Sequence, residues 1–173
     1  TSAGGHLVAM LQASGDVKEL EGDLGKHQGA GSRVTCAVDF FGPTELLTMG
    51  KGPRIDHDAA GSPESKLVGG PLQETKNAAK QASPITHVSK DDPPILIIHG
   101  GNDPLVPYDQ SVRFHAAHKK AGVESILIQM TGGGHGGFRN RELDARVQAF
   151  LDKHLRGVDS EISDKPIQAR RRR

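Results

Sequence analysis

Three apolar runs along the chain have the pattern of buried β-strands. The clearest is 95–99, which has four consecutive large aliphatic residues and follows two prolines. The runs 33–41 and 125–130 are more mixed, and a glycine follows each within two residues. Near-continuous apolar runs of this length are typical of strands that are covered on both faces of a parallel sheet. We therefore expect about three parallel strands.

Between these runs the apolar residues are spaced as on helices. We expect a helix over 2–12, a second from Pro107 to about residue 121 that ends at Gly122, and an amphipathic helix over 139–155. Shorter helices are expected at 17–20, 45–49 (capped by Thr44), 64–68 and 72–81. Strands that alternate with helices predict an α/β fold with right-handed crossovers.

The expected elements fall within residues 1–156. Inside this range, 50–92 is rich in glycine and proline and is expected to form a small irregular segment that covers one end of the sheet. Residues 157–173 are polar and end in four arginines, and we expect them to form a disordered tail. Only 35% of the residues are hydrophobic, which is low for a self-sufficient domain and favours the C-terminal part of a larger domain.

Composition excludes several classes of partner. The net charge is +1, so no overall field attracts nucleic acid, and no run is long enough to span a membrane. The single cysteine, Cys36, cannot form an internal disulfide and is expected to be a buried structural thiol. The triplet Asp56-His57-Asp58 lacks further ligands, so we expect a solvated loop, with no metal and no cofactor.

Three loops carry residues suited to nucleophilic catalysis. Thr1-Ser2-Ala3-Gly4 matches the last four positions of the nucleophile-elbow pattern Gly-x-Ser-x-Gly. Asp103 follows the strand expected at 95–99, and His135 lies in a glycine-rich loop after 125–130. Because the carboxyl ends of parallel strands meet at one edge of a sheet, these loops are expected to converge there.

The residue types fit one chemistry. A serine hydroxyl becomes a good nucleophile when an imidazole accepts its proton, and a carboxylate orients that imidazole. The order Ser2, Asp103, His135 is that of α/β-hydrolases. The remaining histidines are interpreted as helix-surface or loop residues: His6, His87, His99, His115, His118 and His154.

The chain resembles a known family through several short segments. They are Ser-Ala-Gly-Gly-His-Leu (2–7), Asp-Phe-Phe-Gly-Pro-Thr (39–44), Ser-Pro-Ile-Thr-His-Val-Ser (83–89), Pro-Pro-Ile-Leu-Ile-Ile-His-Gly (93–100), Asp-Pro-Leu-Val-Pro (103–107) and Gly-Gly-Gly-His-Gly (132–136). Up to about residue 156 they are similar to the esterase/lipase branch of the α/β-hydrolase superfamily, most of all to small bacterial carboxylesterases related to acetyl-xylan and feruloyl esterases.

The resemblance implies Ser2 as nucleophile, Asp103 as acid, His135 as base and the amide of Ala3 as one oxyanion donor. The family's His-Gly-Gly loop, which supplies the second donor, precedes the elbow and has no counterpart here. His99-Gly100-Gly101 has the same letters but leads to the acid. In addition, His6 is expected to line the substrate pocket, with Phe41, Gly42 and Leu105 as apolar walls.

Three functions are compatible with these residues. The first is a serine carboxylester hydrolase that acts through an acyl-enzyme on small-molecule esters with short acyl or aryl groups. The second is a serine peptidase of the prolyl-oligopeptidase type, which shares the order Ser, Asp, His. The third is a catalytically silent binding or assembly module, in which an exposed sheet edge joins copies into a homo-oligomer.

Overall fold

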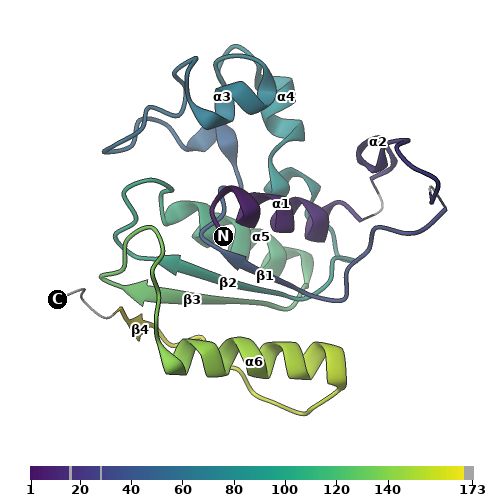
Figure 1. Ribbon diagram of the computed structural model, residues 1–173, viewed down its shortest axis with the longest axis vertical. Coiled ribbons are helices and arrows are strands. Elements are labelled where there is room, and N and C mark those ends of the chain that lie inside the picture. Colours follow the sequence, from purple (N-terminus) through teal and green to yellow (C-terminus); the bar gives the residue numbers. More distant parts are fainter. Residues whose placement is uncertain (16, 28, 170–173) are drawn as a thin grey trace.

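The computed structural model describes residues 1–15, 17–27 and 29–169, in which helices and strands alternate as expected (Figure 1). These residues form one sheet of four parallel strands in the order β1-β2-β3-β4, so the fold is α/β. The elements are α1 (Ala3–Ala13), α2 (Lys18–Glu21), β1 (Ala37–Phe40), the 3-10 helix η1 (Leu46–Thr48), α3 (Pro63–Val68), α4 (Lys76–Gln81), the 3-10 helix η2 (Pro84–His87), β2 (Ile95–Gly100), α5 (Asp109–Ala121), β3 (Ser125–Thr131), α6 (Arg141–Arg156) and β4 (Ile167–Gln168).

Helices cover both faces of the sheet, α1 and α5 on one side and α6 on the other (Figure 1). On the first side the buried residues are Ala9, Ala37, Ile95, Ile97 and Phe114. On the α6 side they are Leu96, Ile98, Ile128, Met130, Leu143, Phe150 and Ile167. Alternate side chains of β2 enter each group, because successive residues of a strand point to opposite faces. This explains why β2 is buried along its whole length.

Strand β1 is less buried than its sequence predicted. Ala37 and Asp39 face the α1 side and are buried, whereas Val38 and Phe40 are only half-buried. β1 lies at one edge of the sheet, and its two half-buried residues lie at the margin of the cluster under α6. Cys36, which was expected to be buried, is only partly buried and lies at the margin of the same cluster.

The structure differs from the disordered tail expected for 157–173. Residues 167 and 168 form β4, which pairs in parallel with the end of β3 and raises the number of strands from three to four. Ile167 is buried under α6, and the guanidinium of Arg146 donates hydrogen bonds to the carbonyls of Ser163 and Lys165. The expectation was wrong for the part up to 169 because two isoleucines, Ile162 and Ile167, supply apolar contacts within a polar segment. Residues 170–173 lie outside the described residues.

The segment 50–92 forms an irregular layer above α1, with α3 and α4 at its top (Figure 1). Its buried residues Leu72 and Ala79 pack with Leu46 and Met49 and with Val106, which belongs to the loop after β2. The segment therefore contacts the loop that carries Asp103. Thr44 was expected to cap the helix at 45–49. Its hydroxyl instead donates a hydrogen bond to the carbonyl of Gln110 on α5.

Candidate active site

The backbone at Ser2 has the strained geometry of a nucleophile elbow. Ser2 has φ 53° and ψ −122°, a conformation that non-glycine residues seldom adopt outside functional sites. Its N–H donates to the carbonyl of Phe40 at the end of β1 (2.9 Å), and α1 begins at the next residue. The half-buried serine therefore lies between the sheet and the first turn of a helix.

Two glycines let α1 approach β1 closely behind Ser2. A Cβ on Gly5 would collide with the carboxylate of Asp39 and lie 2.9 Å from the carbonyl oxygen of Phe40. A Cβ on Gly42 would lie 2.6 Å from the backbone of Gly5 and of His6. The adjacent Gly4 has open space around it. Only one member of the Gly-Gly pair is therefore required by packing.

The three residues expected from separate loops meet in the structure. The Nε2 atom of His135 lies 2.8 Å from the Oγ of Ser2, and its Nδ1 lies 2.7 Å from Oδ2 of Asp103. Since a carboxylate accepts hydrogen bonds, Nδ1 carries a proton and donates it to Asp103. In the neutral ring Nε2 is then free to accept the hydroxyl proton of Ser2. The arrangement can activate a serine hydroxyl.

The carboxylate of Asp103 is held as an anion by the loop after β2. Its Oδ1 accepts hydrogen bonds from the N–H groups of Leu105 (2.8 Å) and Val106 (3.0 Å). Burial by itself would raise the pKa of Asp103, but hydrogen bonds from His99, the Leu105 amide and His135 outweigh it and lower the pKa to about 2. Asp103 is therefore charged at neutral pH.

The loop that carries His135 is fixed from two sides. The carbonyls of Gly133 and Gly134 lie so close to Gly100 of β2 that a side chain there would collide with both. The ring of Phe41 packs edge-on against the imidazole of His135, with the centroids 4.6 Å apart. These contacts hold the ring between Ser2 and Asp103.

The residues expected to line the pocket divide into two groups. His6 lies with Ala3, Leu7, Pro43, Leu46, Pro63, Glu64 and Leu67 around an apolar cavity of about 280 Å³ beside the start of α1, and its Nε2 is 2.7 Å from the carbonyl of Ala82. Phe41 is buried against His135, Gly42 against α1, and the backbone of Leu105 is bonded to Asp103 and His57. Ala3 begins α1, where backbone N–H groups have no partner within the helix.

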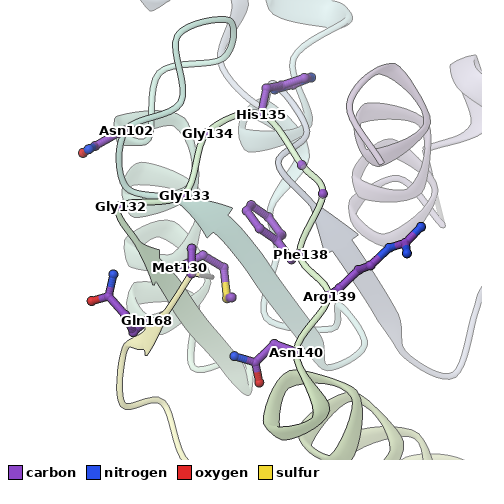
Figure 2. A pocket seen from close by; sticks show the side chains of 13 residues that line it. Asn102, Met130, Gly132, Gly133, Gly134, His135, Phe138, Arg139, Asn140 and Gln168 are labelled. Carbon is purple, nitrogen blue, oxygen red and sulfur yellow. The ribbon is translucent and has the colours of Figure 1, made fainter. Parts of the chain in front are cut away.

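A second cavity, of about 470 Å³, lies behind the histidine loop (Figure 2). Met130, Phe138, Asn140 and Gln168 line it, together with the backbone of the glycine-rich loop. In Figure 2 the ring of His135 points away from these side chains, and its two nitrogens face Ser2 and Asp103 instead. His135 also lines this cavity, whereas Ser2 and Asp103 are not among its lining residues.

Four titratable residues are buried although the sequence did not predict their burial. His99 and His118, expected at the surface or in loops, are fully buried, and His57, expected in a solvated loop, is 1% exposed. The Nδ1 atom of His57 lies 3.1 Å from Oε2 of Glu64. His99 contacts Oδ2 of Asp103 (3.3 Å). Alternation along β2 could have placed His99 on the buried face that Ile95 and Ile97 share.

The fourth residue, Asp39, is a fully buried carboxylate under the elbow. Its Oδ1 accepts the N–H of Gly42 (3.0 Å), and Oδ2 has no partner among the described residues. Burial raises the pKa of Asp39 to about 6, although the Gly42 amide and the charge of His99 act in the opposite direction. The protonated form of Asp39 is therefore favoured by folding.

We expect Asp39→Asn to stabilise the protein at alkaline pH. Since the pKa of Asp39 is raised on folding, its contribution to stability is greatest below about pH 4 and is lost as the pH rises through about 6. An amide keeps the acceptor for Gly42 without the buried charge, so the gain should reach about 1–3 kcal/mol at pH 8 and vanish near pH 4. Urea unfolding at both pH values measures it. The exposed Asp91→Asn is the control, and an equal gain at both pH values would contradict the assignment.

Comparison with known proteins identifies the family. The sequence profile of the BD-FAE family matches residues 1–118, which is more than half of the chain. The chain belongs to the BD-FAE family of α/β-hydrolases. Its relatives include esterases: it is 29% identical to Esterase LipQ of Mycobacterium tuberculosis over 161 residues, 87% of this chain and 36% of LipQ. They also include Dipeptidyl peptidase family member 6 of Caenorhabditis elegans, which is 27% identical over 127 residues, 70% of this chain and 17% of that protein.

Solved structures of esterases are also similar to this chain. A truncated carbohydrate esterase from gut microbiota is 36% identical, with a TM-score of 0.79 over 89% of this chain and 57% of that one. A thermophilic esterase of the Planctomycetes species Thermogutta terrifontis is 27% identical, with a TM-score of 0.63 over 88% of this chain and 52% of that one. The chain thus spans about a third of LipQ and about half of these structures.

Two further observations concern residues 1–15, 17–27 and 29–169. None of their helices is both long and apolar enough to cross a membrane. They also contain no group of three or more His, Cys, Asp or Glu side chains that could hold a metal ion.

Proposed function

We propose that the chain is the catalytic part of a serine carboxylester hydrolase in which Ser2 is the nucleophile, His135 the general base and Asp103 the orienting acid. The observation that carries the proposal is the continuous hydrogen-bond chain from Ser2 through His135 to Asp103, with distances of 2.8 and 2.7 Å. The family and its esterase relatives support the same reaction class.

The reaction follows from the geometry. His135 takes the hydroxyl proton of Ser2 as the oxygen attacks the ester carbonyl, and Asp103 stabilises the imidazolium that forms. The N–H of Ala3, at the first position of α1, is suited to bind the developing oxyanion. His135 then gives the proton to the leaving alcohol, which leaves an acyl group on Ser2. Water, deprotonated by His135, attacks this acyl group, and the acid departs as Ser2 regains its proton.

The cavity beside Ala3 and His6 suits the acyl group of a small-molecule ester. Its walls are largely apolar and its volume is about 280 Å³, which favours short acyl or aryl groups. A relative, the Thermogutta terrifontis esterase, has been solved with propionate bound. The second oxyanion donor does not come from His99-Gly100-Gly101, because the ring of His99 is buried against Asp103 and Gly100 lies against the histidine loop.

Ser2→Ala should abolish hydrolysis and covalent labelling. We expect hydrolysis of p-nitrophenyl acetate to fall by at least about 10³-fold, because the alanine cannot form an acyl-enzyme. A fluorophosphonate probe, which needs only one turnover, should modify Ser2 in the unaltered chain, as detected by peptide mass spectrometry. Ser14→Ala, at the far end of α1, is the control and should react normally. Labelling that survives Ser2→Ala would contradict the proposal.

The same samples separate the alternatives. Cleavage of a proline amide that depends on Ser2, without ester hydrolysis, would identify a peptidase. A folded chain that the probe does not modify would instead favour a binding or assembly module. Light scattering would then show whether the β1 edge joins copies into an oligomer, since an unpaired strand edge invites pairing.

A further inference from the structure

His99 contacts Asp103, the acid of the hydrogen-bond chain that runs from Ser2 through His135. Its Nε2 atom lies 3.3 Å from Oδ2 of Asp103, the oxygen that also receives the Nδ1 proton of His135. The side chains of His99 and Asp103 are both fully buried, whereas that of His135 is 16% exposed. Asp103 therefore lies between two imidazoles, one that reaches Ser2 and one that is sealed in the core.

The surroundings of His99 determine where its proton lies. Nε2 is 3.0 Å from the carbonyl oxygen of Val106, which can only accept a hydrogen bond. Nε2 must therefore carry a hydrogen, which it shares between Val106 and Asp103. Nδ1, 2.6 Å from the Oγ of Ser111 on α5, accepts the serine hydroxyl in the neutral ring. Ser111 and Val106 therefore fix the ring of His99 so that Nε2 lies 3.3 Å from Oδ2 of Asp103.

With His99 counted, the carboxylate of Asp103 has a full set of donors. Oδ1 receives the amides of Leu105 and Val106, and Oδ2 receives the Nδ1–H of His135. The Nε2–H of His99, which is hydrogen-bonded to the Val106 carbonyl, makes a second and longer contact of 3.3 Å with Oδ2. A buried carboxylate with all its acceptor sites filled keeps both its charge and its orientation. The donor from His99 also draws part of the negative charge of Oδ2 away from His135.

We propose that His99, held by Ser111, is a positioning residue that fixes Oδ2 of Asp103 and limits how strongly this oxygen stabilises protonated His135. The proposal rests on the proposed function for its kinetic consequences. Its geometric part does not, because the contacts exist whether or not the chain is active. The other titratable groups that face His99 are Asp39, through its charge, and Tyr108, whose ring lies 5.6 Å away.

Two amide substitutions at the same position separate a positioning role from a packing role. His99→Gln places a nitrogen where Nε2 lies and can keep the donor to Asp103. His99→Asn is shorter, so it can reach Ser111 but not Asp103. Both remove the ring and leave a polar amide, so they perturb the core in similar ways. His118→Asn, on α5, is the control for losing a fully buried histidine that contacts Gln12 and the carbonyl of Phe114 instead.

The readout is the rate of fluorophosphonate labelling of Ser2 between pH 5 and 9. We expect His99→Asn to lower the plateau rate about tenfold, as when a supporting hydrogen bond behind a reacting group is lost. Its acid-side midpoint should rise by about half a pH unit or more, because the freed charge on Asp103 stabilises protonated His135. His99→Gln and His118→Asn should keep the original midpoint. Because the folded fraction can itself change with pH, the rates are compared only over the pH range in which circular dichroism shows every variant to be folded.

Equal midpoints for His99→Asn and His99→Gln would overturn the proposal. The unaltered chain offers an independent test by long-range ¹H–¹⁵N NMR of the histidine rings. His99 should be protonated on Nε2 and not on Nδ1, and a ring protonated only on Nδ1 would also overturn the proposal. If the unaltered chain is not labelled at Ser2, the proposed function fails, while an NMR result with only Nδ1 protonated would independently overturn the role of His99.

Discussion

Gly5→Ala is expected to lower the free energy of unfolding by at least about 3 kcal/mol. The new methyl group would meet the buried carboxylate of Asp39 and the carbonyl of Phe40, neither of which is the free end of a flexible side chain. Relief requires α1 to move away from β1. That movement would also shift Ser2, whose amide is bonded to the same carbonyl of Phe40.

The neighbouring glycine gives a matched control. Gly4 is in the same helical turn, but a Cβ there meets nothing within 4 Å. Gly4→Ala should therefore stabilise the chain by about 0.5–1 kcal/mol, because alanine loses less backbone entropy in a helix. Urea denaturation of the two variants measures the contrast. If Gly5→Ala unfolds at the same urea concentration as Gly4→Ala, α1 and β1 do not approach each other this closely in solution.

Asp103→Asn is expected to lower the turnover of p-nitrophenyl acetate by about 10³–10⁴-fold. The carboxylate now accepts the Nδ1 proton of His135 and leaves Nε2 free to accept from Ser2. An asparagine that presents its NH₂ group to His135 would favour the other tautomer, with Nε2 protonated and unable to take the serine proton. The fold should persist, since Asn can keep an oxygen for the amides of Leu105 and Val106.

Asp109→Asn is the control for this substitution. Asp109 begins α5 six residues later, is exposed, and pairs with Arg113, so its loss should change turnover less than about twofold. Rates and circular dichroism should be measured together. A folded Asp103→Asn variant with more than a tenth of the original turnover would show that Asp103 does not orient His135.

The sheet was predictable where the signal was local. Strand β2 was found almost to the residue, because four large aliphatic residues in a row have few alternatives. Strand β4 could not be found, since Ile167–Gln168 is stabilised by pairing with the end of β3 and by burial under α6, not by its own pattern. The half-burial of β1 likewise depends on where α6 packs.

The residues of the site also differ in how far their local sequence predicts their roles. The motif at Ser2, the loop position of Asp103 and the glycines around His135 carry local information, so the sequence placed the three together. His99 and Asp39 carry none, because their roles depend on burial and on partners elsewhere in the fold. A histidine at the end of an apolar strand gives only the weak hint of alternation.

The hydrogen bond between Ser2 and His135 joins residues 133 positions apart. The parallel pairing of Ala37 with Ile95 spans a further long separation, as parallel strands require. Contacts of such high sequence separation make folding slow, because loop-closure entropy is lost before they form. Because Ser2 is bonded to the end of β1 and His135 follows β3, we expect covalent modification of Ser2 to follow the appearance of the native state during refolding and not that of any local intermediate.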